Sequence, residues 1–238
     1  FNTPQWIGLD NYKRLFQDDL VIKSLFNNFT YTLLYVPANL VLSLLVAVLL
    51  HSKIKGGKVL KTILFFPYIT SSIAITTMWK QMLMPNGPVN TFLRNIGITN
   101  PPGWLASSDS ALYTVVIIAV WAGFGFNMVV FLAGLQGISA DLYEAARLDG
   151  ASEFRIVFSL VFPNVKPAWL TLAIFTFQAV WNQTGTSFIF DENLKLLPTA
   201  LNQITASSGT ARKGVAAAAV SWRSMLSGLT RMPMLLSS

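Results

Sequence analysis

Long apolar stretches alternate with shorter polar segments along this chain. The four clearest apolar stretches are residues 26–50, 62–84, 111–135 and 168–190. Each is close to the roughly 20 residues that a helix needs to cross a bilayer. Pro37 and Pro67 fall inside the first two stretches and predict kinks there, because membrane helices tolerate proline. A fifth, weaker stretch begins near Gly214, so the pattern predicts an all-α, polytopic helical membrane protein with about five spans.

Composition supports the membrane assignment and excludes some chemistry. Of the 238 residues, 53% are hydrophobic and 11% are charged, whereas a soluble domain has about 25% charged residues. The net charge of +7 does not indicate nucleic acid, because the basic residues lie at the ends of apolar stretches rather than among stacking aromatic residues. The chain has no cysteine, which excludes disulfides and thiol chemistry.

The loops predict the orientation of the spans. The loop between the first two stretches carries four basic residues and no acidic one: Lys53, Lys55, Lys58 and Lys61. The next loop, residues 85–110, carries only Arg94 and Asp109 as charged residues. Lysine-rich loops stay in the cytoplasm. Two spans later the chain returns to the same side, so residues 137–167 are also expected to be cytoplasmic.

A polar segment between the third and fourth stretches predicts a short surface helix. It reads Leu142-Tyr143-Glu144-Ala145-Ala146-Arg147-Leu148-Asp149-Gly150. Asp141 is placed to cap the first turn, Glu144 to complete a capping box, and Gly150 to end the helix in a left-handed conformation. The helix is expected from about Leu142 to Asp149.

This short helix has the composition of a protein-docking element. Ala145 and Ala146 keep it slim, while Leu142, Tyr143 and Leu148 offer apolar anchors to a groove. An anionic lipid surface would instead select a cluster of basic residues. A capped amphipathic helix between two spans is also typical of a simple interfacial spacer, so that alternative stays open.

A second short helix is expected after Gly150. Ser152 can cap it, and it should run from Glu153 to about Leu160. Its apolar residues should lie along the inner membrane face: Phe154, Ile156, Val157 and Phe158. Pro163 and Pro167 then fix the turn into the next span.

The spacing of Glu-Ala-Ala, three residues, Gly, nine residues and an apolar-x-apolar-Pro end resembles the EAA loop of binding-protein-dependent ABC importer permeases. The wider string through residues 142–167 is similar to the carbohydrate branch, of the maltose or glycerol-phosphate type. The resemblance covers roughly residues 6–202. It implies that residues 137–167 are a cytoplasmic coupling loop whose ATPase-contacting residues are Leu142, Tyr143, Glu144, Ala145, Ala146, Arg147, Asp149 and Gly150.

The same resemblance implies an assembly. The expected partners are a second homologous permease, two ATPase subunits that hold ATP and Mg, and an extracytoplasmic solute-binding protein. The expected location is the bacterial plasma (inner) membrane. The family fold has six spans, so one further span is expected before residue 1. No nucleic acid partner is expected.

The sequence offers no catalytic residues, cofactor site or metal site. A phosphate-binding loop needs Gly, four residues, then Gly-Lys followed by Ser or Thr. The nearest approach is Gly57-Lys58, but Val59 follows and Ser52 replaces the first glycine. The single histidine, His51, gives too little for a metal site or a catalytic triad. ATP hydrolysis is therefore expected on partner subunits, and the chain itself is not expected to be an enzyme.

A polar stripe in the fourth stretch is a candidate for the substrate path. Gln178, Trp181, Asn182 and Gly185 recur at helical spacing, and they combine amide groups with an aromatic plate that suits sugars. Amides and small residues also pack membrane helices together, so packing is an equal alternative. Weaker candidates are Asn127 beside Gly125, and the hydroxyl residues of the second stretch: Thr70, Ser71, Ser72, Thr76 and Thr77. For those hydroxyls, bonding back to their own helix is the favoured interpretation.

The expected organisation has three parts. Residues 1–25 form an external segment, residues 26–210 the transmembrane permease domain, and residues 211–238 a marginal final span or altered end that contains Arg223. The predicted function is import of a sugar, oligosaccharide or polyol by alternating access, driven by partner ATPases through the EAA loop. The alternatives are a permease for another solute, a secondary transporter without an ATPase, and a scaffold that recruits a cytoplasmic protein.

Overall fold

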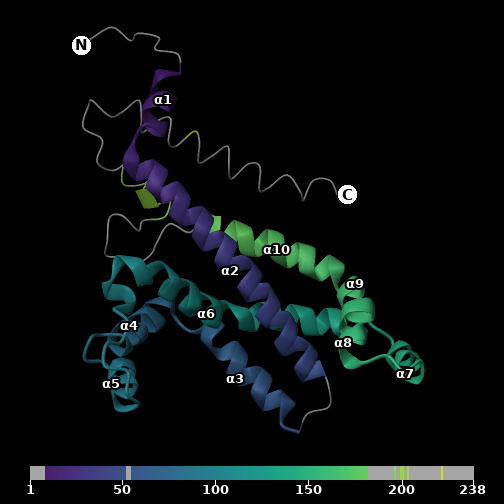
Figure 1. The fold of residues 1–238 in the computed structure, drawn as a ribbon. Coiled ribbons are helices and arrows are strands. Elements are labelled where there is room, and N and C mark those ends of the chain that lie inside the picture. Colours follow the sequence, from purple (N-terminus) through teal and green to yellow (C-terminus); the bar gives the residue numbers. More distant parts are fainter. Residues whose placement is uncertain are drawn as a thin grey trace, which may run out of the picture. The chain divides into compact units, whose positions relative to one another are not determined.

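The computed structural model describes residues 9–51 and 55–181, together with 196, 199–200, 203 and 221. Every regular element in this part of the chain is a helix (Figure 1), which confirms the all-α prediction. The elements are α1 (Asp10–Phe16), α2 (Asp19–His51), α3 (Gly57–Ile69), α4 (Ser72–Met82), α5 (Pro88–Asn95), η1 (Trp104–Ala106), α6 (Ser108–Gln136), α7 (Ala140–Leu148), α8 (Glu153–Ile156), η2 (Val157–Val161), α9 (Phe162–Asn164) and α10 (Lys166–Trp181).

Two described helices are long and apolar enough to cross a membrane by themselves. These are α2, with 33 residues, and α6, with 29 residues. Two further spans are possible if each of two bent helix pairs counts as one: α3 with α4, bent by 95°, and residues 154–164 with α10, bent by 71°. All four predicted stretches are therefore represented, while the fifth, near Gly214, lies outside the described residues.

The second apolar stretch is broken rather than continuous. α3 ends at Ile69, and Thr70 takes an extended conformation with ψ 145° before α4 begins at Ser72. Pro67 lies in the last turn of α3 and Pro37 lies inside α2. A proline cannot donate the backbone hydrogen bond that continues a helix. The predicted kink at Pro67 thus accompanies a full break one turn later.

Contacts divide the chain into two compact units, which are described separately. The first, called here the bundle unit, comprises Leu33–Gln81 and Val115–Phe177. Its hydrophobic core joins one face of α2 to α6 and to the segment that follows α7. The fully or nearly fully buried core residues are Leu40, Ala47, Leu50, Met128, Phe131, Leu132, Leu135, Ile138, Ile156, Val161, Val165 and Leu172.

The second unit contains an ordered loop between α4 and α6. It comprises Phe1–Thr32, Met82–Thr114 and Gln178–Ser238. Trp104 Nε1 donates a hydrogen bond of 2.7 Å to Asn90 Oδ1 of α5, and Ser110 Oγ donates one of 2.7 Å to the Trp104 carbonyl. Trp104 has φ 46°, a conformation that is costly for a bulky residue and persists only where its surroundings hold it. These contacts give the loop a defined conformation. The side chain of Phe92 in α5 is exposed on its surface.

Candidate functional site

The predicted docking helix is present as α7, but its cap differs from the prediction. Ser139 is the N-cap, and its hydroxyl accepts a 3.3 Å hydrogen bond from the Asp141 amide. Asp141 lies inside the first turn, where its charge favours the helix dipole. Because the cap is Ser139, the third helical position is Leu142 rather than Glu144. The predicted capping box was wrong for that reason.

The end of α7 follows the prediction. α7 ends at Leu148, Asp149 is the C-cap, and Gly150 has φ +75°. The Ala151 amide donates a 3.0 Å hydrogen bond back to the Ala146 carbonyl, which is a typical closure of a helix that ends in a left-handed glycine. A Cβ at Gly150 would meet nothing within 4 Å. Glycine is therefore needed here for its left-handed backbone and not for lack of space.

α7 has an inner face and an outer face. Tyr143 and Ala146, one turn apart, pack against the core of the bundle unit. The other predicted coupling residues are exposed: Leu142, Glu144, Ala145, Arg147, Asp149 and Gly150. Leu148 has 84% of its surface exposed, which is unusual for a large apolar side chain that has a core beside it. The outer face therefore offers apolar anchors for another surface.

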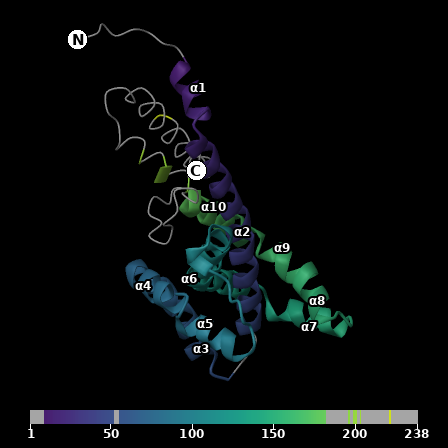
Figure 2. The same ribbon diagram turned by 60° about the vertical axis from the view of Figure 1, so that its left-hand side comes forward.

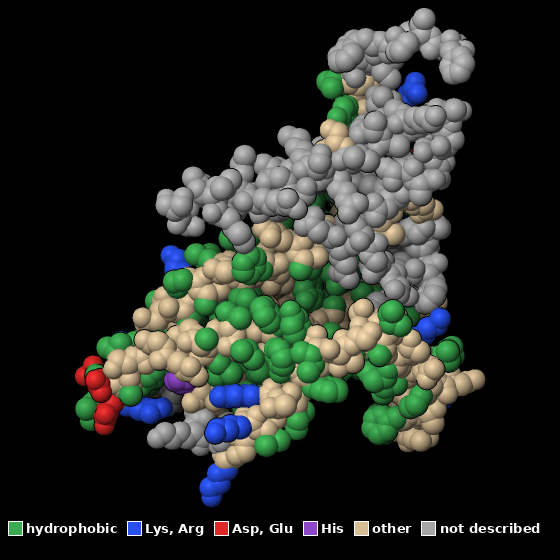
Figure 3. Space-filling view, turned by 180° about the vertical axis from the view of Figure 1, so that it is seen from behind, with side chains coloured by type: hydrophobic (Ala, Val, Ile, Leu, Met, Phe, Trp, Pro, Cys, Tyr) green, Lys and Arg blue, Asp and Glu red, His purple; other side chains and the backbone are tan. Residues whose placement is uncertain are grey.

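α7 stands beyond the ends of α2 and α6 in both ribbon views (Figure 1 and Figure 2). From behind, acidic side chains gather at this tip near the single histidine (Figure 3). On the inner face, burial raises the pKa of the Tyr143 hydroxyl. That hydroxyl is shielded from solvent and has no hydrogen-bond partner.

The second predicted helix is present, but it changes type. Ser152 Oγ accepts a 3.4 Å hydrogen bond from the Arg155 amide, as expected for its cap. α8 then passes into a π-helix, η2, and into α9. Pro163 has no N–H to bond the carbonyl four residues earlier, and a wider π-turn accommodates such a loss. Phe154 and Phe158 are exposed, as a membrane-surface position requires.

The prediction from the sequence was wrong for one residue of that helix. Ile156 was expected along the membrane face, but only 3% of its surface is exposed and it belongs to the bundle core. The reason is geometric. Ile156 lies half a helical turn after Phe154, so the two side chains point to opposite sides of the helix.

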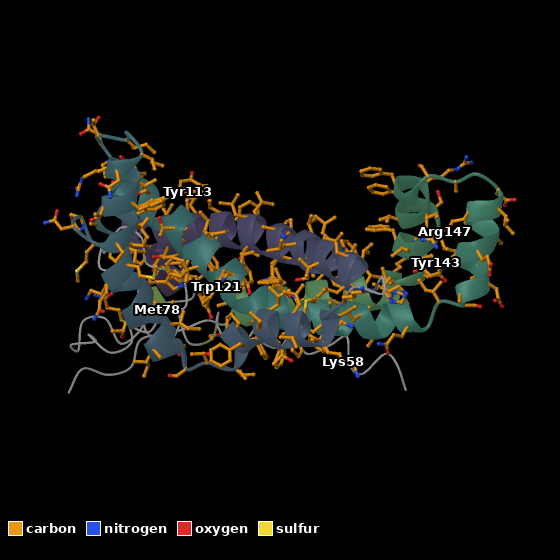
Figure 4. The ribbon with its side chains drawn as sticks, turned by 90° about the horizontal axis from the view of Figure 1, so that it is seen from below. Lys58, Met78, Tyr113, Trp121, Tyr143 and Arg147 are labelled. Atoms are coloured by element: carbon orange, nitrogen blue, oxygen red, sulfur yellow. The ribbon has the colours of Figure 1, made fainter. Side chains whose placement is uncertain are left out.

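The docking loop, residues 137–167, and the lysine-rich loop lie at the same end of the bundle unit. The ring of His51, the last residue of α2, lies 5.9 Å from the Tyr143 ring, and the lysine-rich loop follows His51. Lys58 and Tyr143 lie toward one end of the unit, and Met78 lies toward the other (Figure 4). This placement agrees with the prediction that both loops share one side of the membrane.

A buried polar cluster joins α2, α6 and α10. Asn127 Nδ2 donates hydrogen bonds to Asn39 Oδ1 at 2.6 Å and to Thr176 Oγ1 at 3.3 Å. Ser43 Oγ donates to the Phe124 carbonyl at 3.0 Å. All four polar side chains are buried. We call Asn39, Ser43, Asn127 and Thr176 the polar cluster.

Of these four residues, only Asn127 was a candidate from the sequence. A signal for the others was available, because buried polar residues recur along α2 at spacings of four or seven: Ser24, Asn28, Thr32, Asn39 and Ser43. These spacings place them on one helical face. The apolar composition of the stretch concealed the pattern.

Two glycines allow α6 to approach its neighbours closely. A Cβ at Gly125 would collide with the Leu64 carbonyl of α3, and one at Gly123 would lie 2.6 Å from the Tyr35 hydroxyl. Small residues at such contacts are typical of packed membrane helices. Gly123 and Gly125 therefore belong to helix packing in the bundle unit.

The structure describes part of the predicted substrate stripe. Gln178 and Trp181 lie in the last turns of α10 and are partly buried, while Asn182 and Gly185 lie outside the described residues. The packing face of α10 carries Leu172, Thr176 and Val180, which are buried. Gln178 is about 200° around the helix from Thr176. The stripe and the packing face are thus different sides of α10.

Three of the five weaker hydroxyl candidates in the second stretch behave as the favoured interpretation predicted. The side chains of Thr70, Thr76 and Thr77 donate hydrogen bonds of 2.6–3.0 Å to carbonyls four residues earlier in their own chain. Among the described residues, no three His, Cys, Asp or Glu side chains gather as metal ligands.

The folded chain therefore has the features of a helical membrane protein, with a short helix that protrudes beyond the ends of α2 and α6 (Figure 1). Residues 20–227 match the family described as the inner membrane component of binding-protein-dependent transport systems, and the chain belongs to this family. The family match covers both α7 and the polar cluster. It also extends through the segment after residue 181 that the structure does not describe.

Individual proteins agree with the family match. The chain is 37% identical over 169 residues to the probable ABC transporter permease protein YesP of Bacillus subtilis (strain 168), covering 70% of this chain and 54% of that protein. It is 32% identical over 187 residues to the lactose transport system permease protein LacF of Rhizobium radiobacter, covering 78% and 61%. The chain spans about half to two thirds of the length of these relatives.

A solved structure shares the fold. A chain of a bacterial alginate ABC transporter, crystallised with an alginate pentasaccharide-bound periplasmic protein, superposes with a TM-score of 0.81 at 22% identity. The match covers 95% of this chain and 81% of that chain. At this identity the likeness concerns the fold alone.

Proposed function

We propose that this chain is the membrane-spanning permease subunit of an ATP-driven importer for a sugar, oligosaccharide or polyol. It works by alternating access, and its docking loop couples it to partner ATPase subunits that bind and hydrolyse ATP with Mg. A second homologous permease and an extracytoplasmic solute-binding protein complete the assembly. The family membership of residues 20–227 supports this proposal, as does the lactose transport named for LacF.

The observation that carries the proposal is the outer face of α7. Leu142 and Leu148 are exposed apolar residues on a capped helix, and the same helix is anchored by Tyr143 to the core of its own chain. A partner that grips α7 more tightly in one state than in another can bias the permease between two conformations. The docking loop lies in the cytoplasm of a bacterial cell in this proposal, where ATP is available.

The substrate path includes Gln178 and Trp181, together with Asn182 and Gly185, in this proposal. Support comes from the described part of α10, where Gln178 and Trp181 lie away from the packing face formed by Leu172, Thr176 and Val180. Amide groups bind sugar hydroxyls, and an aromatic ring binds the apolar face of a sugar.

Co-purification after gentle solubilisation tests the proposed function. The wild-type chain should bring down a nucleotide-binding ATPase and a second permease. Leu148→Glu should lose the ATPase and keep the second permease, because a buried, unpaired charge in the docking groove is costly. Phe92→Glu is the matched control, since Phe92 is an exposed apolar residue of the α4–α6 loop, and it should keep both partners. A wild-type complex without any ATPase would refute the proposal.

A further inference from the structure

The inner face of α7 makes one aromatic contact with the end of a membrane span. The Tyr143 ring lies 5.9 Å from the His51 ring, with 33° between the ring planes. His51 is the last residue of α2, whereas Tyr143 lies in the middle of α7. The contact therefore joins the docking helix directly to α2, which is distant in sequence.

A pocket lies beside this contact. A cavity of about 950 Å³ opens beside the contact, and its walls include Val48, Gln136, Ser139, Tyr143 and Val157. Rigid coupling between elements needs atoms in contact. Tyr143 and Ala146 are the residues of α7 that pack against the bundle core, and the Tyr143 ring is the one that contacts the ring at the end of α2.

The hydroxyl of Tyr143 contributes nothing to this link. It is shielded from solvent and has no hydrogen-bond partner. An unpaired buried hydroxyl destabilises the folded state, so the aromatic ring must be the useful part of the side chain. This distinction makes Tyr143→Phe a conservative variant with a clear expectation.

α2 is in turn fixed to α6 by the polar cluster. Asn39 accepts from Asn127, and Ser43 donates to the Phe124 carbonyl. The hydrophobic core also joins α2 to α6, so a displacement of the end of α2 would reach α6 through packed side chains and these buried hydrogen bonds. The path from the docking helix to α6 runs through His51, along α2, and across the polar cluster.

We propose that Tyr143 is a positioning residue that ties α7 to the end of α2 through His51, so that the two helices move as one body during transport. The inference rests on the proposed function, because it assigns a route by which the movement of α7 reaches the spans. Its role is mechanical. Leu142 and Leu148 face the partner, whereas Tyr143, which the family resemblance had placed among the ATPase contacts, packs against its own chain and is assigned no ATPase contact here.

Substitution of Tyr143 separates coupling from folding. In the purified importer, Tyr143→Ala should keep the ATPase bound and keep ATP hydrolysis, while solute moved per ATP falls at least fivefold. Tyr143→Phe should keep the wild-type ratio. A Tyr143→Ala variant with an unchanged ratio of solute to ATP would overturn the proposal, and so would a Tyr143→Phe variant that fails as badly as Tyr143→Ala.

A covalent replacement of the contact gives a rescue test. The chain has no cysteine, so His51→Cys combined with Tyr143→Cys introduces the only two thiols. Without treatment this double variant should be uncoupled like Tyr143→Ala. A short bifunctional thiol reagent should restore the amount of solute moved per ATP, since the two helices are then tied again.

The outcomes separate the two proposals. Cross-linking that leaves transport uncoupled would overturn the role of Tyr143 while the wild-type importer still works. Each single cysteine variant treated with the same reagent is the control and should show no rescue. A wild-type complex with no ATP-driven uptake would instead remove the proposed function itself.

Discussion

The docking loop and the polar cluster differ in where their polar groups find partners. In α7 the polar side chains face outward, and only Tyr143 and Ala146 pack against the chain's own core. In the polar cluster, Asn39 and Asn127 are buried and bond to each other. Water can satisfy the first set, but the bilayer cannot satisfy the second, so cluster residues bond to one another inside the protein, and only Asn39 Nδ2 of these side chains is left without a partner. The polar cluster therefore holds spans together, whereas the outer face of α7 is left exposed, where we propose that a partner binds.

Gly125→Ala gives the largest expected effect on the cluster side of this comparison. The added methyl collides with the Leu64 carbonyl, and backbone cannot move aside as a side chain can. The free energy of unfolding in detergent should fall by about 1–3 kcal/mol, measured by thermal or denaturant unfolding.

Gly134→Ala is the matched control on the same helix. Its methyl would meet Ala168 and Val165 side chains at 3.6 and 3.7 Å, which is ordinary contact. Equal stability of the two variants would contradict the close approach of α6 and α3.

Gly150→Ala tests the loop side of the comparison. Alanine is disfavoured by about 1–2 kcal/mol in the left-handed conformation, and this cost falls on the end of α7. ATP-driven uptake should fall severalfold while the unfolding of the spans is unchanged. Gly56→Ala is the control. Gly56 is also left-handed, with φ +82°, and has open space around it, but it lies in the lysine-rich loop. A similar loss of uptake in both variants would show that the effect is not specific to docking.

A double-mutant cycle on Asn39 and Asn127 should give a smaller effect. Hydrogen bonds between membrane helices contribute about 0.6–1.7 kcal/mol, so the coupling energy between Asn39→Ala and Asn127→Ala should fall in this range. The bound ATPase should remain in all three variants. A coupling energy near zero would mean that the 2.6 Å bond does not stabilise the bundle unit.

The two regions were predictable from sequence to different degrees. α7 was located correctly because Gly150 and the alanines are local signals, although the cap was assigned to Asp141 rather than Ser139. The full break after Ile69 was not predicted, because Pro67 indicated only a kink and hydropathy does not report bends. The partners of Asn127 could not be predicted, since Asn39 and Thr176 lie far away in sequence. Which faces of α7 and α10 pack inward also depends on tertiary contacts.

Cross-linking from the outer face of α7 tests the central claim most directly. Leu148→Cys would be the only thiol in the chain, and in the purified complex it should cross-link to a nucleotide-binding ATPase. Ala146→Cys, one turn removed from Tyr143 on the inner face, should not. Absence of any cross-link to an ATPase from Leu148→Cys, or labelling of that thiol from outside intact cells, would contradict the account.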